Sequence, residues 1–301
     1  MKAFFYLPWW FFKAKFLGCQ KPLQTVLFIS DKCNLACKHC TVYRTQDIHI
    51  KTYEQIKQEL EYSYRQGSRF IDFEGGEPTL WHDAVPHRNY DLNSLITLAK
   101  EMGFYSTTIT TNALMPFTGS KADSIWVSLD GLGIYHDEIR GKGSFDRLVQ
   151  NIATANHPNL SANMVINSRN FISVEETIEF VKNHPALRSI SLNFHTPFKG
   201  SEHLFLSWEN REKVIDLLIA KKKAGYPIMN SVSGLKLMKH NHFKKQCWVT
   251  NFILADGTRL RECQGKTAGI CDQCGLSMSG EMKSILSFKP DTIFAGMKLR
   301  M

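Results

Sequence analysis

Seven of the eight cysteines lie in two short groups, and these thiols are the side chains in the sequence most suited to chemistry. The first group, with the spacing C-x3-C-x2-C, comprises Cys33, Cys37 and Cys40. The second group comprises Cys247, Cys263, Cys271 and Cys274. Eight cysteines in 301 residues are too few for a disulfide scaffold, and clustered thiols are typical of metal or iron–sulfur ligands in a reducing compartment.

The first group lies on one tight loop and offers three thiolates. Three thiolates can bind three irons of a [4Fe-4S] cluster and leave the fourth iron open for a substrate or cofactor, whereas electron-transfer sites close every iron with a protein ligand. Zinc is the alternative, but zinc prefers paired C-x2-C knuckles that supply four ligands. The spacing therefore favours an iron–sulfur cluster with one open iron.

The second group surrounds a predicted hairpin. Residues 248–261 read as a strand, an Asp256-Gly257 turn and a second strand, which would place Cys247 and Cys263 at its two ends. Four thiols brought to one point can hold zinc or an auxiliary cluster, and the residues alone leave both open. A basic stretch at 236–245 precedes the group. We expect a solvated face there, with an anion-binding wall as the alternative.

The rest of the chain alternates between strand and helix patterns. Apolar runs predict strands at 24–30, 69–74, 104–110, 124–129, 160–166 and 189–194. Helical patterns occupy 52–66, 92–102, 144–156, 173–183 and 207–225. Repeated strand–helix units predict a parallel sheet, and six units are fewer than the eight of a closed barrel. The expected fold class is α/β, either an open, partial barrel or a doubly wound sheet.

The composition excludes one class of chain and leaves several partners open. With 43% hydrophobic and 22% charged residues, the chain can bury a sizeable core, which excludes wholesale disorder. The formal net charge of +9 is carried by no long Lys/Arg block. Such a charge suits an anionic ligand, a membrane surface or nucleic acid about equally, so it decides nothing alone.

Further polar and glycine-rich motifs follow the predicted strands, at the carboxyl ends where folds of this kind place their sites. The second strand is followed by Gly75, Gly76, Glu77 and Pro78. The third strand is followed by Asn112, and the fourth by Ser128, Asp130 and a run, HDEIRGKGSF, that contains Arg140. The fifth and sixth strands end near Asn167 and His195.

Together these motifs resemble the signature of the radical S-adenosylmethionine (radical SAM) superfamily, over nearly all of residues 22–280. The resemblance implies that Cys33, Cys37 and Cys40 bind a [4Fe-4S] cluster whose open iron binds the amine and carboxylate of S-adenosylmethionine. The reduced cluster would cleave this cofactor to a 5′-deoxyadenosyl radical, which abstracts hydrogen from a substrate.

The resemblance also implies individual cofactor contacts. Gly75, Gly76, Glu77 and Pro78 would receive the methionine ammonium, with the glycines allowing a close backbone approach. Arg140 would bind the methionine carboxylate, for which a permanently charged, bidentate donor is suited. The alternative is a surface ion pair between Asp137 and Arg140. The other expected contacts are Asn112, Ser128 and Asp130, with Asn167 at the ribose and His39 and His195 near the adenine. His39 stands where relatives usually carry an aromatic residue.

The layout of the second cysteine group resembles the Twitch module, a shortened relative of the SPASM domain. It implies an auxiliary [4Fe-4S] cluster on Cys247, Cys263, Cys271 and Cys274. The expected fold is thus a partial (β/α)6 TIM-like barrel with a small C-terminal Twitch-type module. The expected divisions are an aromatic N-terminal segment at 1–21, the barrel at 22–230, the module at 231–280 and a C-terminal tail at 281–301.

The N-terminal segment is rich in aromatic residues and holds no acidic residue before Asp31. On a helix, Lys13 and Lys15 would flank an aromatic stripe, which is the pattern of an interfacial helix. The stripe comprises Phe5, Trp9, Phe12 and Phe16. A membrane span needs about 20 apolar residues, and the two lysines stop this segment short. The alternative is that the same aromatic residues pack on the body of the protein.

The expected function is that of an enzyme. A non-catalytic iron–sulfur electron carrier or zinc-binding protein would have no use for a site that binds a methionine ammonium and carboxylate. Small-molecule or lipid substrates rank above peptides. Peptide-modifying relatives commonly carry a leader-recognition domain before the barrel, and we expect none here because the first predicted strand begins at residue 24. We expect a reductant such as flavodoxin or ferredoxin, no nucleic acid partner, and a cytoplasmic location with possible peripheral contact at the inner membrane face.

Overall fold

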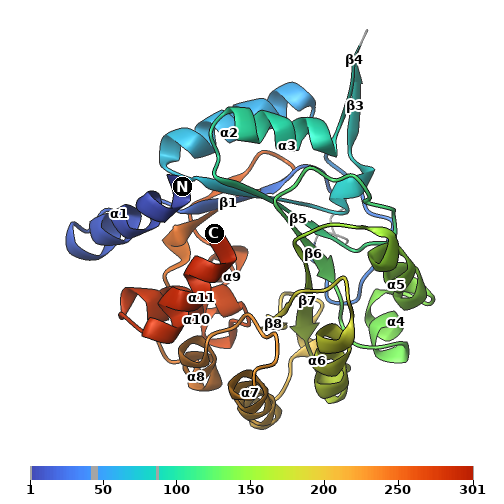
Figure 1. Ribbon diagram of the computed structural model, residues 1–301, viewed down its shortest axis with the longest axis vertical. Coiled ribbons are helices and arrows are strands. Elements are labelled where there is room, and N and C mark those ends of the chain that lie inside the picture. The colour runs from blue at the N-terminus through green and yellow to red at the C-terminus, as the bar shows by residue number, and fades with distance from the viewer. Residues whose placement is uncertain (1, 42–46, 86–87, 301) are drawn as a thin grey trace.

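The computed structural model describes residues 2–41, 47–85 and 88–300. A curved sheet forms its centre, and most helices lie on the outer side of this sheet (Figure 1). Six parallel strands follow one another across the sheet in sequence order. They are β1 (Gln24–Phe28), β2 (Phe70–Glu74), β5 (Ser106–Thr111), β6 (Ser124–Ser128), β7 (Leu160–Ile166) and β8 (Ile190–Phe194). The prediction of a partial barrel is confirmed.

The sheet continues beyond β1 into the region of the second cysteine group. β9 (Thr250–Ile253) pairs in parallel with β1, and β10 (Arg259–Leu260) pairs antiparallel with β9. The predicted hairpin is therefore present, with Gly257 at a φ of 91° in its turn. Because β9 extends the barrel sheet, the hairpin is anchored to the same scaffold that carries the first cysteine group.

Side-chain alternation along each strand decides which residues face the helices. In β2, Ile71 and Phe73 are buried in the core beneath the helices, whereas Asp72 and Glu74 are half-buried on the opposite, inner face of the sheet. The outer face is covered by α2 (Tyr53–Gln66), α3 (Leu92–Glu101), α5 (Ser144–Thr154), α6 (Val174–Asn183) and α7 (Trp208–Lys223). These helices match the predicted ones, and β5 and β6 are joined without a helix, as the sequence suggested.

Several elements were not expected. β3 (His82–Val85) and β4 (Arg88–Asp91) form a hairpin that projects from the body (Figure 1). The additional helices are α4 (Ile134–Arg140), α8 (Val232–His240), α9 (Gln264–Thr267), α10 (Ser277–Leu286) and α11 (Pro290–Arg300). α10 packs against α8 and spans residue 280, where the C-terminal tail was expected to begin. The tail and the cysteine region are thus continuous in the structure, and the division into domains stays a prediction.

The aromatic N-terminus is a helix, α1 (Lys2–Phe16), with two different faces. One face packs onto the residues at which strands begin: Trp10 shares a small core with Leu23, Phe70 and Val249. The Tyr6 hydroxyl also donates to the Gly67 carbonyl at 2.7 Å. This face therefore covers the amino ends of the strands, at the opposite end of the barrel from the motifs that follow them.

The other face of α1 is the predicted aromatic stripe, and it is exposed. Phe5, Trp9, Phe12 and Phe16 are 44% to 69% exposed. The helix runs through Pro8. Within the described residues, every helix is too short or too polar to cross a membrane.

Candidate active site

The first cysteine loop follows β1 and is held by the glycine turn that follows β2. The Gly76 N–H donates to the Ser30 carbonyl at 2.6 Å, and the Glu77 N–H donates to the Lys32 carbonyl at 2.9 Å. A Cβ at Gly75 or Gly76 would lie 2.2 Å from the carbonyl oxygen of Ser30 or Lys32, respectively. The glycines are therefore required for contact between the two loops, which is a different reason from the expected approach to a ligand.

The three thiols of the first group lie close enough to act on one another electrostatically. Cys37 is buried, and Cys33 and Cys40 are half-buried. Burial raises the pKa of Cys33, and it raises the pKa of Cys37 to about 11. These two thiols are thus protonated at neutral pH in the metal-free chain, and iron binding must release their protons.

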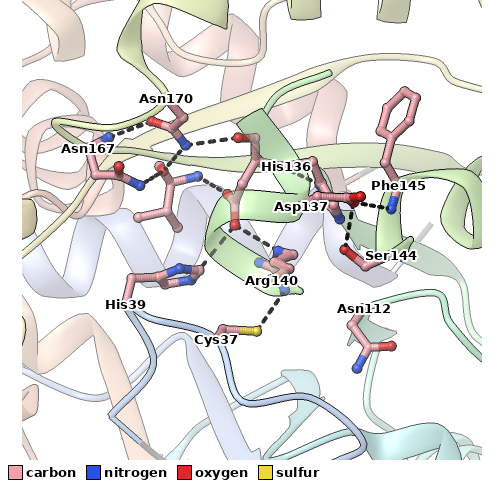
Figure 2. A network of polar contacts seen from close by, with 12 residues as sticks. Cys37, His39, Asn112, His136, Asp137, Arg140, Ser144, Phe145, Asn167 and Asn170 are labelled. Carbon is pink, nitrogen blue, oxygen red and sulfur yellow. Dashed lines mark hydrogen bonds and ion pairs between the residues drawn. The ribbon is translucent and has the colours of Figure 1, made fainter. Parts of the chain in front are cut away.

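Arg140 ends α4 beside this loop, as Figure 2 shows. Its Nε donates to Asp130 Oδ2 at 2.7 Å, and its Nη1 lies 3.9 Å from Cys37 Sγ. Asp130 is fully buried, and its Oδ1 accepts from the Val165 N–H at 2.8 Å. Burial alone would raise the pKa of Asp130, but the charge of Arg140 lowers it, so the pair is ionised.

The alternative of a surface ion pair between Asp137 and Arg140 is wrong. Asp137 accepts instead from the Gly143 N–H at 2.6 Å. It also accepts from the Phe145 N–H at 2.9 Å and from the Ser144 hydroxyl at 3.2 Å (Figure 2). Asp137 therefore secures the start of α5. This leaves the buried guanidinium of Arg140 at the cysteine loop.

Three histidines line the same region. His39 Nε2 lies 3.8 Å from Asp130 Oδ2, and the ring centroids of His39 and His195 are 6.5 Å apart. The two residues expected near the adenine are therefore neighbours. His195 Nε2 lies 3.0 Å from the Ser201 carbonyl oxygen. His136 Nδ1 accepts from the Asp130 N–H at 3.1 Å, and burial lowers the pKa of His136 to about 4, so this imidazole is neutral.

Glu77 joins the ends of β2 and β5. Its Oε1 accepts from the hydroxyls of Thr79 and Thr111, at 2.6 and 2.7 Å, and its Oε2 accepts from the Asn112 N–H at 2.7 Å. Burial raises the pKa of Glu77, although these donors oppose the shift. The carboxyl group expected to receive the methionine ammonium thus already has protein donors, and that role stays a prediction. Pro78 begins the short 3-10 turn that Glu77 caps.

Asn112 connects the end of β5 to the cysteine loop. Its Nδ2 donates to Asn34 Oδ1 at 2.8 Å and lies 3.9 Å from Cys33 Sγ. Asn34 was not predicted as a site residue, and its only signal in the sequence was its position inside the C-x3-C spacing. Ser128, at the end of β6, is buried and in register with Asn163 of β7.

Asn167, the expected ribose contact, is fully buried and bonded within its own loop. Its Oδ1 accepts from the Arg169 N–H at 2.9 Å, and its N–H donates to Asn170 Oδ1 at 2.7 Å. Asn170 in turn donates to the Asp130 carbonyl at 2.9 Å (Figure 2). Asn167 thus helps to support the Asp130 backbone, and its contact with ribose stays a prediction.

The inner face of the sheet carries polar side chains that the sequence analysis missed. Thr110 Oγ1 lies 3.4 Å from Asp72 Oδ1 and 3.3 Å from Glu74 Oε1. Burial raises the pKa of Glu74, and a hydrogen bond with Asp72 opposes this shift. Across the sheet, Asn193 Nδ2 donates to Asn163 Oδ1 at 2.9 Å. The alternation of acidic and apolar residues in β2 was the signal for this face.

The second cysteine group is drawn together by the hairpin. The thiols of Cys247 and Cys263 are hydrogen-bonded to each other, and those of Cys271 and Cys274 act on Cys247 electrostatically. The hydrogen bond from Cys247 lowers the pKa of Cys263 to about 6. Within the described residues, no three thiol, imidazole or carboxylate groups converge tightly enough to hold a single metal ion.

The second group also lies at the carboxyl end of β8. The Phe194 N–H donates to the Gly275 carbonyl at 2.8 Å, and the Gly275 N–H donates to Thr196 Oγ1 at 3.0 Å. A Cβ at Gly275 would lie 1.8 Å from the Phe194 carbonyl oxygen. The Cys274-Gly275 segment is therefore fixed beside His195, at the same end of the barrel as the first cysteine group.

Comparisons with known proteins identify the class to which this fold and site belong. Residues 27–181, more than half of the chain, match the Radical SAM superfamily. The chain therefore belongs to the radical SAM superfamily. The predictions of this superfamily, of its fold and of an enzyme are confirmed.

Particular relatives are distant and longer than the matched region. The chain is 25% identical over 216 residues to the mycofactocin maturase MftC of Mycolicibacterium smegmatis, covering 68% of this chain and 53% of the relative. It is 25% identical over 249 residues to the Fe-coproporphyrin III synthase of Methanosarcina barkeri, covering 74% and 60%. The structure of Streptococcus suis SuiB bound to S-adenosylmethionine matches with a TM-score of 0.64 and 16% identity, over 82% of this chain and 61% of that chain. The chain thus spans about half to three fifths of the length of these proteins.

Proposed function

We propose that this chain is a radical SAM enzyme that forms a 5′-deoxyadenosyl radical and uses it to abstract hydrogen from a small-molecule substrate. The observation that carries the proposal is the ion pair between Arg140 and Asp130, in which Arg140 Nη1 lies 3.9 Å from Cys37 Sγ. An electron-transfer cluster is closed by four protein ligands, whereas this loop supplies three thiols with a guanidinium beside them. A carboxylate that approaches the open iron would find this guanidinium in place.

The residues of the site fit the cofactors that the superfamily implies. Cys33, Cys37 and Cys40 supply three thiols on one loop, beside an arginine and above a glycine turn. A [4Fe-4S] cluster held there, once reduced by one electron from flavodoxin or ferredoxin, would supply the cleavage of the cofactor's C5′–S bond, which releases methionine and the radical.

The protein's own groups prepare this site for the cofactor. Asp130 orients the Arg140 guanidinium toward the methionine carboxylate, and the neutral His136 fixes the Asp130 backbone. His39 and His195 form an adenine-binding wall. The remaining assigned cofactor contacts are Gly75, Gly76, Glu77, Pro78, Asn112, Ser128 and Asn167.

The second group is proposed to hold an auxiliary [4Fe-4S] cluster, with zinc as the alternative. The donor set is four thiols, and the buried Arg211 beside them has two nitrogen atoms, Nε and Nη1, without a hydrogen-bond partner in the described part of the chain. An anionic centre with four thiolates suits this surrounding. Assays of iron and acid-labile sulfide distinguish an iron–sulfur cluster from zinc.

The proposed substrate is a small polar molecule. The inner face of the sheet presents Asp72, Glu74, Asn163 and Asn193, all half-buried, which suits a hydrogen-bonding substrate more than an acyl chain. The exposed aromatic face of α1 lies at the opposite end of the barrel, so membrane contact there would not bring a lipid to the cysteine loops. A peptide substrate is the second candidate, because SuiB has also been crystallised with its precursor peptide SuiA.

Metal content and cofactor cleavage test this proposal. After anaerobic reconstitution, the full chain should bind about eight irons and eight sulfides, since a [4Fe-4S] cluster takes four of each. Replacing Cys33, Cys37 and Cys40 with Ala should halve the iron and abolish 5′-deoxyadenosine formation with dithionite and S-adenosylmethionine. The Cys19→Ala variant is the matched control and should retain both. Deoxyadenosine from the triple variant would overturn the assignment of the first group.

We also propose that the enzyme works in the cytoplasm, with α1 resting on the inner face of the membrane. Lys13 Nζ lies 4.6 Å from the Trp9 ring. Lys15 Nζ lies 5.4 Å from the ring of Phe288, an exposed residue whose ring is 6.0 Å from that of Phe16, so both ammonium groups border the exposed aromatic face. Aromatic residues favour the headgroup level, and lysines favour anionic lipids. Binding should be reversible and should weaken with salt.

A flotation assay tests this contact. The full chain should float with anionic vesicles, and a variant with Phe5→Ser, Trp9→Ser and Phe12→Ser should not, because those side chains are exposed and the packed face is left intact. A control with Ile134→Ser and Ile172→Ser removes exposed apolar side chains elsewhere and should float like the original. Equal flotation of all three proteins, or of none, would contradict the proposal.

A further inference from the structure

Arg211, in the first turns of α7, carries a buried charge that the protein itself does not neutralise. The residue is 1% exposed, and its Nη2 donates to the Cys274 carbonyl at 2.9 Å. Its Nε and Nη1 are buried and have no hydrogen-bond partner among the residues described. Its guanidinium carbon lies 4.6 Å from the Phe194 ring centroid and 4.8 Å from that of Trp208, so the two rings hold the group in place.

Such an arrangement is unfavourable unless a negative group completes it. A buried charge without a partner destabilises a fold, and an apolar side chain of similar size would be better tolerated. An arginine guanidinium keeps its charge at neutral pH, so this buried group is charged in the metal-free chain. No carboxylate pairs with it in the described ranges, and the thiol of Cys274 is the acidic group that acts on it.

A second cation approaches the same thiols. Lys245 Nζ donates to the Asn241 carbonyl at 2.6 Å and to Asn241 Oδ1 at 2.8 Å, while Asn241 itself donates to the Cys274 carbonyl at 3.2 Å. The thiols of Cys271 and Cys274 both act on Lys245 electrostatically. Lys245, at the end of the basic stretch, is thus half-buried beside the cysteines.

We propose that Arg211 is the buried counter-charge of an iron–sulfur cluster bound by Cys247, Cys263, Cys271 and Cys274. This inference rests on the auxiliary cluster of the proposed function. Four thiolates outweigh the positive charge of the core, so the bound group is anionic, and one-electron reduction makes it more so. A fixed cation beside Cys274 stabilises the reduced form more than the oxidised form and raises the reduction potential. Arg211 is therefore a positioning and tuning residue, not a cluster ligand.

The test uses the full chain with Cys33, Cys37 and Cys40 replaced by Ala, so that iron signals come from the second group alone. In this background, Arg211→Met should lower the midpoint potential in an EPR-monitored redox titration, because a cation is lost. Arg211→Lys should restore part of the shift. Arg188→Met, which removes an exposed arginine, is the matched control and should leave the potential unchanged.

The effect of Arg211→Met on stability is a second readout, and we expect it to differ in sign between the metal-free and the reconstituted chain. In the metal-free chain, Arg211→Met removes an unpaired buried charge and should leave the unfolding free energy unchanged or higher. In the reconstituted chain, the same substitution should lower stability or iron retention. A purely structural role predicts the same loss in both states and no change in potential, and that result would overturn the proposal. Absence of iron and sulfide from the background protein would instead overturn the auxiliary cluster itself, and the counter-charge with it.

Discussion

Two buried arginines lie next to the two cysteine groups, and the protein treats their charges in opposite ways. Arg140, beside Cys37, is paired with Asp130 at 2.7 Å. Arg211, beside Cys274, has no paired carboxylate in the part of the chain that the structure describes. The barrel therefore balances its own buried charge at the first group, whereas the second group leaves a positive charge uncompensated.

This difference indicates two ways of preparing a binding site. The Asp130–Arg140 pair is held by the Val165 N–H before any cofactor binds, so the guanidinium needs no reorganisation when a carboxylate arrives. The positive charge of Arg211 is neutralised only when the four cysteines bind an anionic group. We therefore expect the barrel site to be rigid in the metal-free chain, and the second site to gain stability on reconstitution.

The largest expected effect comes from making the first site resemble the second. Asp130→Asn keeps an acceptor for the Val165 N–H but leaves Arg140 buried without its charge partner. Breaking a buried pair in this way should lower the unfolding free energy of the metal-free chain by about 3–5 kcal/mol. Urea denaturation measures the change.

The control for this substitution is Asp137→Asn. Asp137 is half-buried in the same segment and accepts hydrogen bonds at the start of α5, and its amide replacement should alter stability by no more than about 1 kcal/mol. If the two variants unfold at the same urea concentration, Asp130 does not neutralise Arg140 and the contrast between the two sites is lost.

A second prediction sharpens the contrast at the level of binding. Arg140→Met should weaken the affinity for S-adenosylmethionine by on the order of 2–5 kcal/mol, because a buried, charged partner of the carboxylate is removed. Iron content should not change, since Arg140 supplies no ligand. Equilibrium binding to the reconstituted protein measures the effect.

The control is Arg169→Met, which removes an arginine from an exposed ion pair with Glu138 and should bind the cofactor normally. Unchanged affinity in Arg140→Met would limit this residue to a structural role.

The sequence predicted the first site better than the second, and the reason is the kind of interaction involved. The strands, the outer helices and the motifs at the strand ends follow from local periodicity and spacing, and the structure gathers Cys37, Asp130 and Arg140 as expected. Arg211 lies in a regular helical pattern, and only tertiary packing shows that its charge is buried.

Individual side-chain directions were also beyond the sequence. Asn167 and Glu77 stand at the expected strand ends, but both are bonded to neighbouring protein groups because a buried polar side chain takes the nearest partner. In α1, periodicity did predict the shared aromatic stripe of Phe5 and Trp9. It did not show that the opposite face, with Trp10, carries the packing.

The smallest expected effect concerns a second uncompensated group near the C-terminus. Glu281, on α10, is half-buried, and its Oε1 accepts from the Ser231 N–H at 2.9 Å at the start of α8. Burial raises the pKa of Glu281 to about 7 from its ordinary 4.5. The folded chain therefore holds a proton that the unfolded chain releases in this range. The stabilising contribution is complete below about pH 4.5 and is lost as the pH rises through about 7.

Glu281→Gln keeps the acceptor and mimics the protonated carboxyl group, so it should remove this pH dependence. At about pH 8 the variant should be more stable than the original chain, by on the order of 3 kcal/mol at about 1.4 kcal/mol per pKa unit, and near pH 4.5 the two should be equal. Urea denaturation of the metal-free chains across this range gives the comparison, with exposed Glu176→Gln as the matched control. Parallel stability curves for Glu281→Gln and the original chain would mean that Glu281 is ionised at no cost, and that the uncompensated charge of this region is confined to Arg211.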